Sequence, residues 1–326
     1  WRTPDGGNSW DVLSPDLTRH DPSTLGHSGG PITGDMNGPE VYATIFTVAP
    51  GKLETDVIWT GSDDGLVHVT RDGGESWTDV TPPDMPDFAR VSLIDASAFD
   101  SGRAYMCAKL PLLDDKAPYI WKTDDFGQSW TKIVNGIRDG AFVHTVREDP
   151  NREGLLYAGT NNGVYISYDD GGHWRELNPG FPDIPVSSLI VEHDELAMAS
   201  HGRGFWILDN IEPLRQARPG MTDEEVILFD PASAMRSSVG ATIAYWLKEV
   251  PDEARLEILD AGGEVLRTFE PLGAGEGGGR WGGGSLPLDA GLNRLQWDLR
   301  TDPAPTFPGM ILWGVRTMSA TAPPGR

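Results

Sequence analysis

The sequence predicts an all-β protein built from small antiparallel sheets, and three observations support this. The 326 residues include 40 Gly, 26 Pro and 12 Trp, a composition typical of short strands joined by tight turns around large aromatic side chains. A turn-like octapeptide recurs four times, which indicates a repeated structural unit. Helical patterns are almost absent, and the best candidate is the short segment 211–217.

The octapeptide has the pattern Ser/Thr-x-Asp-x-Gly-x-x-Trp. The Asp side chain is expected to accept hydrogen bonds from backbone N–H groups just downstream and so close a turn. The Gly two positions later permits positive φ, and the Trp begins the returning strand and covers the turn. We therefore interpret these carboxylates as structural rather than catalytic. The four copies contribute Asp5 and Trp10, Asp72 and Trp77, Asp125 and Trp130, and Asp169 and Trp174.

This pattern resembles the Asp-box (BNR) repeat, which occurs in β-propellers such as sialidases, xyloglucan-degrading glycosidases, sortilin-type receptors and photosystem assembly factors. The stretches 27–33, 59–68 and 201–209 are similar to large bacterial sortilin-like Asp-box proteins, often described as glycosyl hydrolases. The resemblance covers nearly the whole chain. It implies a propeller of four-stranded antiparallel blades, while an Asp box specifies function only weakly.

The strand-like segments divide into blades on that basis. Three complete blades are expected within 41–81, 91–134 and 142–177, and a fourth begins at 186–209 without an Asp box. The first Asp box supplies only the end of a blade. Two arrangements remain open: residues 8–13 complete the last blade of a four-bladed ring, or the ring is larger and its other blades lie outside this chain. We favour the larger ring, because the proteins that this chain resembles carry more blades and the chain starts within a hairpin.

A different module is expected at the C-terminal end. We expect propeller blades over 1–210, a linker over 211–225 and the second module over 226–326. Strand-like runs at 241–248, 255–259, 264–270, 292–299 and 310–313 support that module. The phrases at 256–267 and 291–298 resemble hook-capping-type Ig-like domains and imply an Ig-like β-sandwich. Trp281, the one large residue in the Gly-rich stretch 273–284, is a candidate anchor for a partner.

Charge and cysteine content exclude several classes. The formal net charge is −23, which disfavours nucleic acid and anionic lipid as partners. No apolar run is long enough to cross a bilayer, and the single cysteine, Cys107, precludes an intrachain disulfide. The seven histidines lack the paired spacing of metal ligands, so we expect neither a metal site nor a cofactor.

Candidate functional residues lie in the turns between second and third strands and in the blade-to-blade connections. These loops share the face opposite the Asp boxes, where a rigid scaffold commonly carries function. Three turns at 61–65, 159–163 and 200–204 could converge on one pocket. Candidate binding residues on this face are His20, His27, Arg138, Asn161, Asn162, His201 and Arg203.

A catalytic pair of carboxylates is a second possibility on this face. Asp63 or Asp64 could act with Asp114 or Asp115 in glycoside hydrolysis, which requires one protonated and one ionised acid. A sialidase would need an arginine cluster, but Arg90, Arg138, Arg147 and Arg203 are scattered along the chain.

These observations favour a non-catalytic interaction or scaffolding module. We expect it to be extracytoplasmic, either periplasmic or secreted, with other protein subunits as partners, including those of a membrane-associated complex. The alternative is a glycoside hydrolase that acts on a polysaccharide through paired carboxylates, with a glycan as its partner.

Overall fold

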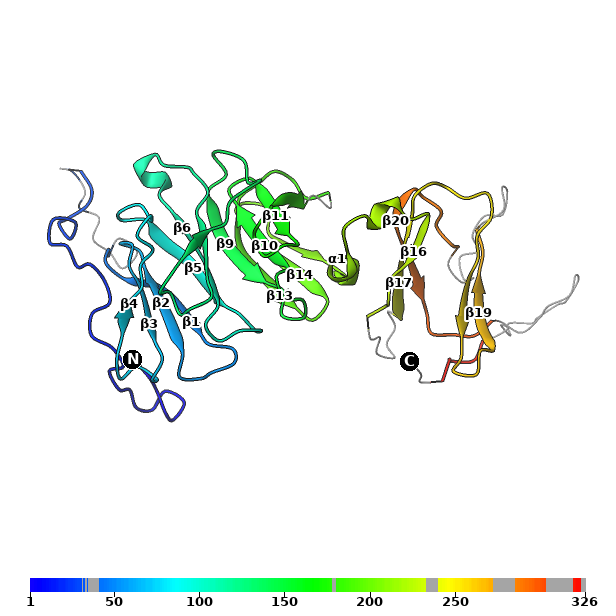
Figure 1. Cartoon of the computed structure of the whole chain (residues 1–326), viewed down its shortest axis with the longest axis horizontal. Coiled ribbons are helices and arrows are strands. Elements are labelled where there is room, and N and C mark those ends of the chain that lie inside the picture. Colours follow the sequence, from blue (N-terminus) through cyan, green and yellow to red (C-terminus); the bar gives the residue numbers. More distant parts are fainter. Residues whose placement is uncertain are drawn as a thin grey trace, which may run out of the picture. The chain divides into compact units, whose positions relative to one another are not determined.

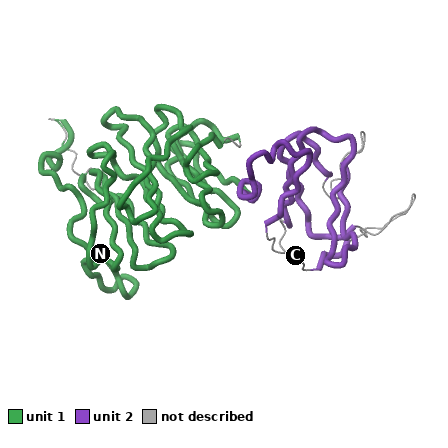
Figure 2. The backbone as a smooth tube through the Cα atoms, in the orientation of Figure 1, with its two compact units in different colours: residues 1–209 green, residues 210–326 purple. Residues whose placement is uncertain are grey.

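The computed structural model describes residues 1–30, 32, 34, 41–177, 180–232, 240–271, 285–302 and 319–323. The chain divides into two compact units, Trp1–Asp209 and Asn210–Arg326, drawn in green and purple in Figure 2. Each unit has its own sheets and its own buried clusters.

Unit 1 contains four antiparallel sheets in which consecutive strands pair (Figure 1). Three sheets have four strands and the last has three, so the prediction of repeated four-stranded antiparallel sheets is confirmed. These sheets are propeller-like blades, numbered one to four along the chain. Blade one has β1 (Ile45–Pro50), β2 (Ile58–Ser62), β3 (Val67–Thr70) and β4 (Thr78–Asp79); blade two has β5 (Arg90–Ala96), β6 (Ala104–Lys109), β7 (Ile120–Thr123) and β8 (Thr131–Lys132); blade three has β9 (Val143–Glu148), β10 (Leu156–Thr160), β11 (Gly163–Ser167) and β12 (Arg175–Leu177); and blade four has β13 (Val186–Glu192), β14 (Glu195–Ser200) and β15 (Phe205–Leu208).

Neighbouring blades pack face to face through large buried side chains. Trp59 of blade one and Trp121 of blade two belong to one buried cluster, and Tyr105 of blade two and Tyr165 of blade three belong to the next. Because blade two is covered on both faces, its strand β6 is apolar and buried from Ala104 to Ala108. A continuous apolar run is the expected pattern for such a strand.

The four blades form an open arc rather than a closed four-bladed ring. Apolar side chains at both ends are exposed, including Val48 on β1 (61%) and Phe205 on β15 (85%). Residues 1–13 do not close the ring: Arg2 and Asp11 pair as a hairpin, and this segment lies beside β3 and β4 in Figure 1. Among the described residues, β15 has no fourth strand beside it. The structure therefore differs from the four-bladed alternative, while the larger ring stays a prediction.

In all four Asp boxes the Asp side chain closes the turn. Asp72 accepts hydrogen bonds from the backbone N–H and hydroxyl of Ser76 at 2.9 and 2.6 Å, and from the Thr70 hydroxyl at 2.7 Å. The Gly two positions after this Asp, Gly74, has a φ of +99°, a conformation that strains residues with a side chain. Corresponding backbone bonds hold Asp5, Asp125 and Asp169.

The Trp of an Asp box fastens its blade to the preceding blade, a role that the turn pattern alone does not indicate. The indole N–H of Trp130 donates to the carbonyl of Val80 at 2.7 Å, and that of Trp174 donates to Ile133 at 2.8 Å. Trp77 binds the carbonyl of Leu13 in the same way at 3.2 Å. Each acceptor lies three residues after the Trp of the preceding Asp box. We call this contact the blade clip.

The Asp-box glycines complete the blade clip. A Cβ added at Gly74, Gly127 or Gly171 would lie 2.5–2.7 Å from the side chain of Leu13, Val80 or Ile133, respectively. A side chain at these glycines would therefore push the preceding blade away. At Gly7 of the first box an added Cβ meets nothing within 4 Å, and Trp10 donates only to Gly7 of its own turn at 3.2 Å.

Unit 2 contains two antiparallel sheets that share a buried cluster. The cluster includes Tyr245, Phe269 and Leu295. The segment 211–225, predicted as a linker, holds two short helices, and its Met221 is buried against Phe229 of the same unit. The predicted strand 310–313 and Trp281 lie outside the described residues. The elements are α1 (Glu212–Gln216), η3 (Met221–Asp223), the sheet of β16 (Val226–Leu228), β17 (Ala241–Leu247) and β20 (Gly291–Trp297), and the pair β18 (Leu256–Leu259) and β19 (Val265–Phe269).

The blade clip predicts unequal effects of equivalent substitutions. Trp174→Phe removes the indole N–H that satisfies the Ile133 carbonyl and leaves a gap in a buried cluster. We expect it to lower the free energy of unfolding by about 2 kcal/mol or more. Trp10→Phe, in an exposed turn, is the control and should change it by less than about 0.5 kcal/mol. Urea unfolding measures both variants, and equal effects would contradict the clip.

The Asp boxes also predict an acid-dependent loss of stability. Hydrogen bonds from Ser76, first from its hydroxyl and then from its backbone N–H, lower the pKa of Asp72 to about 2 from its ordinary 3.8. Because the folded pKa lies below the unfolded one, the stabilisation is complete above about pH 4 and is lost as the pH falls through 2. We therefore expect the stability difference between wild type and Asp72→Ala to shrink between pH 5 and pH 2 in urea unfolding experiments. A difference that does not vary with pH would be inconsistent with this.

Candidate functional site

The turns between second and third strands occupy equivalent places in three blades. The backbone N–H groups of Asp63, Asn161 and His201 each donate at 3.0 Å to the carbonyl of a residue just before the first strand of the same blade. Those acceptors are Thr44, Phe142 and Pro185. Blade two has a longer loop here, which contains the 3-10 helix η2 (Pro111–Leu113).

Asp63 and Asp64 fasten the long loop that precedes blade one. Asp63 accepts the backbone N–H of Thr44 at 2.8 Å on one oxygen and the Thr44 hydroxyl at 3.0 Å on the other. Asp64 accepts the backbone N–H groups of Arg19 at 2.8 Å and of His20 at 3.3 Å on Oδ2. Its Oδ1 is buried without a hydrogen-bond partner in the part of the chain that the structure describes.

Arg19 connects three loops at this point. Its Nε donates to the Asp64 carbonyl at 2.8 Å, its Nη2 lies 3.2 Å from the Asp87 carboxylate, and its guanidinium carbon lies 5.1 Å from the centre of the Phe88 ring. The loop before blade one, the turn at Asp64 and the connection to blade two are thereby held together.

Asp115 shapes the loop of blade two, whereas Asp114 is exposed. Asp115 accepts the Ala117 backbone N–H at 3.0 Å and the Tyr119 hydroxyl at 2.7 Å. Asp114 lies 3.5 Å from Lys116 at the surface. Both oxygens of Asp63 and both oxygens of Asp115 are thus engaged in holding loops.

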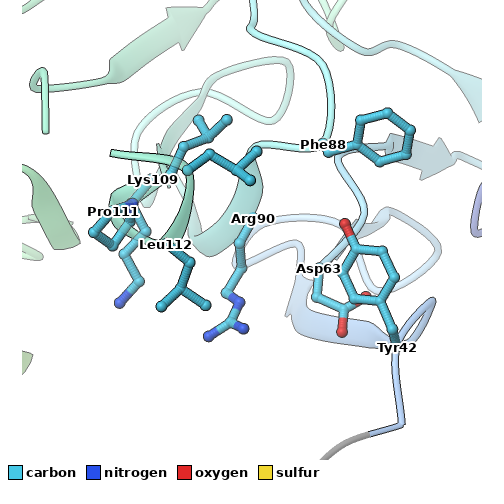
Figure 3. A pocket seen from close by; sticks show the side chains of 9 residues that line it. Tyr42, Asp63, Phe88, Arg90, Lys109, Pro111 and Leu112 are labelled. Atoms are coloured by element: carbon cyan, nitrogen blue, oxygen red, sulfur yellow. The ribbon is translucent and has the colours of Figure 1, made fainter. Parts of the chain in front are cut away.

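The loops of blades one and two enclose a small pocket, which we call the Leu112 pocket. Its volume is about 220 Å³. Asp63 is the one member of the four candidate acids that lines it. Figure 3 shows Lys109, Leu112 and Arg90 extending in the same direction, with Leu112 between the two cationic side chains. The lining residues are Tyr42, Asp63, Phe88, Arg90, Lys109, Leu110, Pro111, Leu112 and Leu113.

The cations of the Leu112 pocket have neutral partners. Arg90 lies over the ring of Phe46, with its guanidinium carbon 4.9 Å from the ring centre. The Lys109 ammonium lies 2.7 Å from Nδ1 of His144. Burial lowers the pKa of Lys109, and the neighbouring Arg90 lowers it further. Tyr42 has a raised pKa because of burial and the nearby charges of Asp63 and Asp64.

His144 on β9 connects Lys109 of blade two with His201, which lies in a turn of blade four. Its ring centre lies 6.1 Å from that of His201. Burial, followed by Lys109 and His201, lowers the pKa of His144 to about 4. An ammonium only donates hydrogen bonds, so Nδ1 accepts from Lys109 and the proton of the neutral ring is on Nε2. In the described residues this buried Nε2 has no hydrogen-bond partner.

Arg138 and Asn162 line a second pocket of about 210 Å³, the Arg138 pocket. Here the cation is paired: Arg138 Nη2 lies 2.9 Å from Asp183, and Nη1 lies 4.0 Å from Glu176. Of the three equivalent turns, the first contributes Asp63 to the Leu112 pocket and the second contributes Asn162 to the Arg138 pocket.

The other described candidate binding residues line neither of these two pockets. His20 is 3.2 Å from Asp16 and exposed, while His27 and Arg203 are exposed in their loops. Asn161 and His201 form the turns already described. No cluster of three or more His, Cys, Asp or Glu suited to a metal ion occurs among the described residues. Within that same part of the chain, no helix has the length and apolarity needed to cross a membrane.

Sequence reasoning missed Tyr42, Lys109, Leu112 and His144, and considered Arg90 only as a scattered arginine. The sequence did contain a signal that could have identified Arg90 and Lys109 as neighbours. Arg90 precedes the expected first strand of blade two and Lys109 ends the second strand. In an antiparallel pair the start of one strand lies beside the end of the next, and the two residues are indeed paired opposite each other.

The contact between Lys109 and His144 predicts a shift in titration. Lys109→Met removes a positive charge next to Nδ1, so the pKa of His144 should rise from about 4 toward its ordinary 6.5, while burial keeps it lower. NMR titration of the imidazole ring protons measures this. Lys132→Met, on the outer strand of blade two, is the control and should leave His144 unchanged. An unchanged pKa in Lys109→Met would contradict the contact.

Comparison with known proteins finds no matching family model and no matching curated protein. Among solved structures, the chain is similar to YCF48 bound to D1 peptide, with 17% identity, a TM-score of 0.40 and coverage of 70% of this chain and 69% of that chain. It is also similar to an ancestral GH74 enzyme (14% identity, TM-score 0.41, 70% and 33% covered) and to the GH74 xyloglucanase from Xanthomonas campestris (13%, 0.40, 70% and 38%). The chain spans 33% and 38% of the length of these two enzymes. At such identities the likeness concerns the fold alone.

Proposed function

We propose that this chain is a non-catalytic protein-interaction module that binds its partner through the loop-rich face around the Leu112 pocket. The observation that carries this is the exposure of Leu112 and Leu113, at 88% and 67%, on a loop held in place by Asp115. Exposed apolar side chains beside a pocket are typical of interaction sites. Because the loop is fixed before binding, little conformational entropy is lost when a partner docks.

The positions of the candidate acids also favour binding over catalysis. Glycoside hydrolysis needs two opposed carboxyl groups that flank the scissile bond. Asp63 and Asp115 use both oxygens to hold loops, and Asp114 is exposed beside Lys116. The alternative, a glycoside hydrolase, is favoured by one observation: Asp63 lines the Leu112 pocket.

Three finer assignments accompany this proposal. We propose that the four blades belong to a larger Asp-box propeller, supported by the open arc and the exposed apolar ends. The two sheets of unit 2 over one buried cluster support an Ig-like sandwich. We also propose an extracytoplasmic location with other protein subunits as partners, because a rigid, acidic scaffold with exposed loops suits a docking role there.

Substituting the exposed leucines tests the interaction. The chain is extracted gently under native conditions, and native mass spectrometry identifies the associated polypeptides. The double variant Leu112→Asp/Leu113→Asp should lose its partner, because burying two new carboxylates in an interface is unfavourable. Leu53→Asp, which is exposed on the opposite face in the turn between β1 and β2, should retain it.

Two results would contradict the proposal. One is the absence of any associated polypeptide in the wild-type extract. The other is cleavage of a polysaccharide by the purified chain that Asp63→Asn abolishes, which would establish the hydrolase alternative.

A further inference from the structure

Two cations lie side by side in the Leu112 pocket, and neither forms an ion pair with a carboxylate among the described residues. Arg90 and Lys109 are direct cross-strand partners on β5 and β6, and like charges in that position repel each other. Within the described residues, no carboxylate lies within ion-pair distance of either one, Asp63 included.

The contacts of Arg90 with Phe46 and of Lys109 with His144 hold the two side chains in place without pairing them with a negative charge. The Arg90 guanidinium lies over the ring of Phe46, a contact that uses none of its N–H groups as hydrogen-bond donors to a carboxylate. Lys109 uses one of its three donors on His144. Both groups are therefore held in position and retain donors for a carboxylate, which is the acceptor that Arg pairs with most strongly.

The same pocket offers an apolar surface between the two cations. Leu110, Leu112 and Leu113 line it together with Phe88, and Leu112 lies between Arg90 and Lys109 in Figure 3. Asp63 also lines the pocket but forms no ion pair with either cation among the described residues, and its two oxygens accept hydrogen bonds from Thr44. The volume of about 220 Å³ is small, so the pocket accepts side chains of an extended segment rather than a folded surface.

We propose that the Leu112 pocket binds an extended acidic segment of a partner protein, with Asp or Glu carboxylates against Arg90 and Lys109 and a neighbouring apolar side chain against the leucines. This inference rests on the proposed interaction function and assigns the chemistry of the partner. Charge complementarity selects this occupant: a basic or neutral segment would leave both cations buried without compensation.

The Arg138 pocket provides an internal comparison on the same face. Arg138 is already paired with Asp183 and lies near Glu176, so an acidic segment would have to displace an existing carboxylate. The two pockets are similar in size, and they differ in the pairing of their cations as well as in the leucines that line the Leu112 pocket. Arg138→Gln is therefore the matched control for Arg90→Gln.

The proposal is tested on the full chain by phage display of random peptides. Each peptide is joined to the phage coat protein through its C-terminus, so the only carboxylates that it presents are those of its side chains. We expect the selected peptides to combine Asp or Glu with Leu-like residues. Fluorescence anisotropy with the most enriched peptide, synthesised with an amidated C-terminus, then measures affinity. Arg90→Gln and Lys109→Met should each weaken binding about tenfold, and Arg138→Gln by less than about twofold. Thermal unfolding of each variant verifies that it is folded.

Three results would overturn the proposal. They are no enrichment of any peptide, enrichment of basic or neutral peptides, and equal affinity of the Arg90→Gln, Lys109→Met and wild-type chains for an acidic peptide. The proposed interaction function is tested separately by the Leu112→Asp/Leu113→Asp variant. Partner binding that requires the leucines but not the two cations would reject the acidic segment and leave the interaction function intact.

Discussion

The hydrogen bond from an Asp-box Trp to the carbonyl of the preceding blade is the interaction on which unit 1 depends. A β-meander alone specifies a blade but not how blades stack. The indole N–H of Trp174, buried next to Ile133, fixes the position of blade three on blade two, and the side chain of Ile133 lies over Gly171 of the same box. An indole that failed to reach its carbonyl would leave two buried polar groups unpaired. The contact therefore favours one stacking geometry over others of similar apolar burial.

The blade clips join neighbouring blades through the Asp-box face of the arc. The loops on the opposite face are therefore not needed to hold the blades together, and their length and sequence can vary. Blade two replaces the tight turn of the other blades with the longer loop that carries Leu112. That loop costs little stability, since loop-closure entropy grows slowly with length. Its carboxylates, such as Asp115, bind backbone N–H groups and hold the loop in shape. The Asp-box carboxylates thus bind residues of their own turn, whereas on the opposite face Asp63 and Asp64 bind a loop that is distant in sequence.

The features that sequence predicts well are those set by neighbouring residues. The Asp-box turns join residues at most four positions apart, as Asp72 and Ser76 do, so the repeated octapeptide marks the turn between the third and fourth strands of blades one to three. The clip joins residues 41–64 positions apart, from Trp174 to Ile133 and from Trp77 to Leu13, and no local pattern reveals it. The Leu112 pocket also brings together residues that are far apart in the sequence, from Tyr42 to Leu113. The pairing of Arg90 with Lys109 needs the register of β5 on β6, which includes a bulge between Val91 and Leu93.

The contrast between the acidic chain and the cationic pocket bears on selectivity. Long-range repulsion from the net negative charge slows the approach of extended polyanions, and it acts over about a Debye length, ~8 Å at physiological salt. Only a ligand that gains short-range contacts can overcome that repulsion. In the Leu112 pocket those contacts require both a carboxylate for Arg90 and Lys109 and an apolar group for Leu112. A highly charged polymer without apolar side chains lacks the second contact, and a purely apolar segment leaves the two cations unpaired. If the pocket binds an acidic segment as proposed, the surrounding charge makes it selective for segments that combine both features.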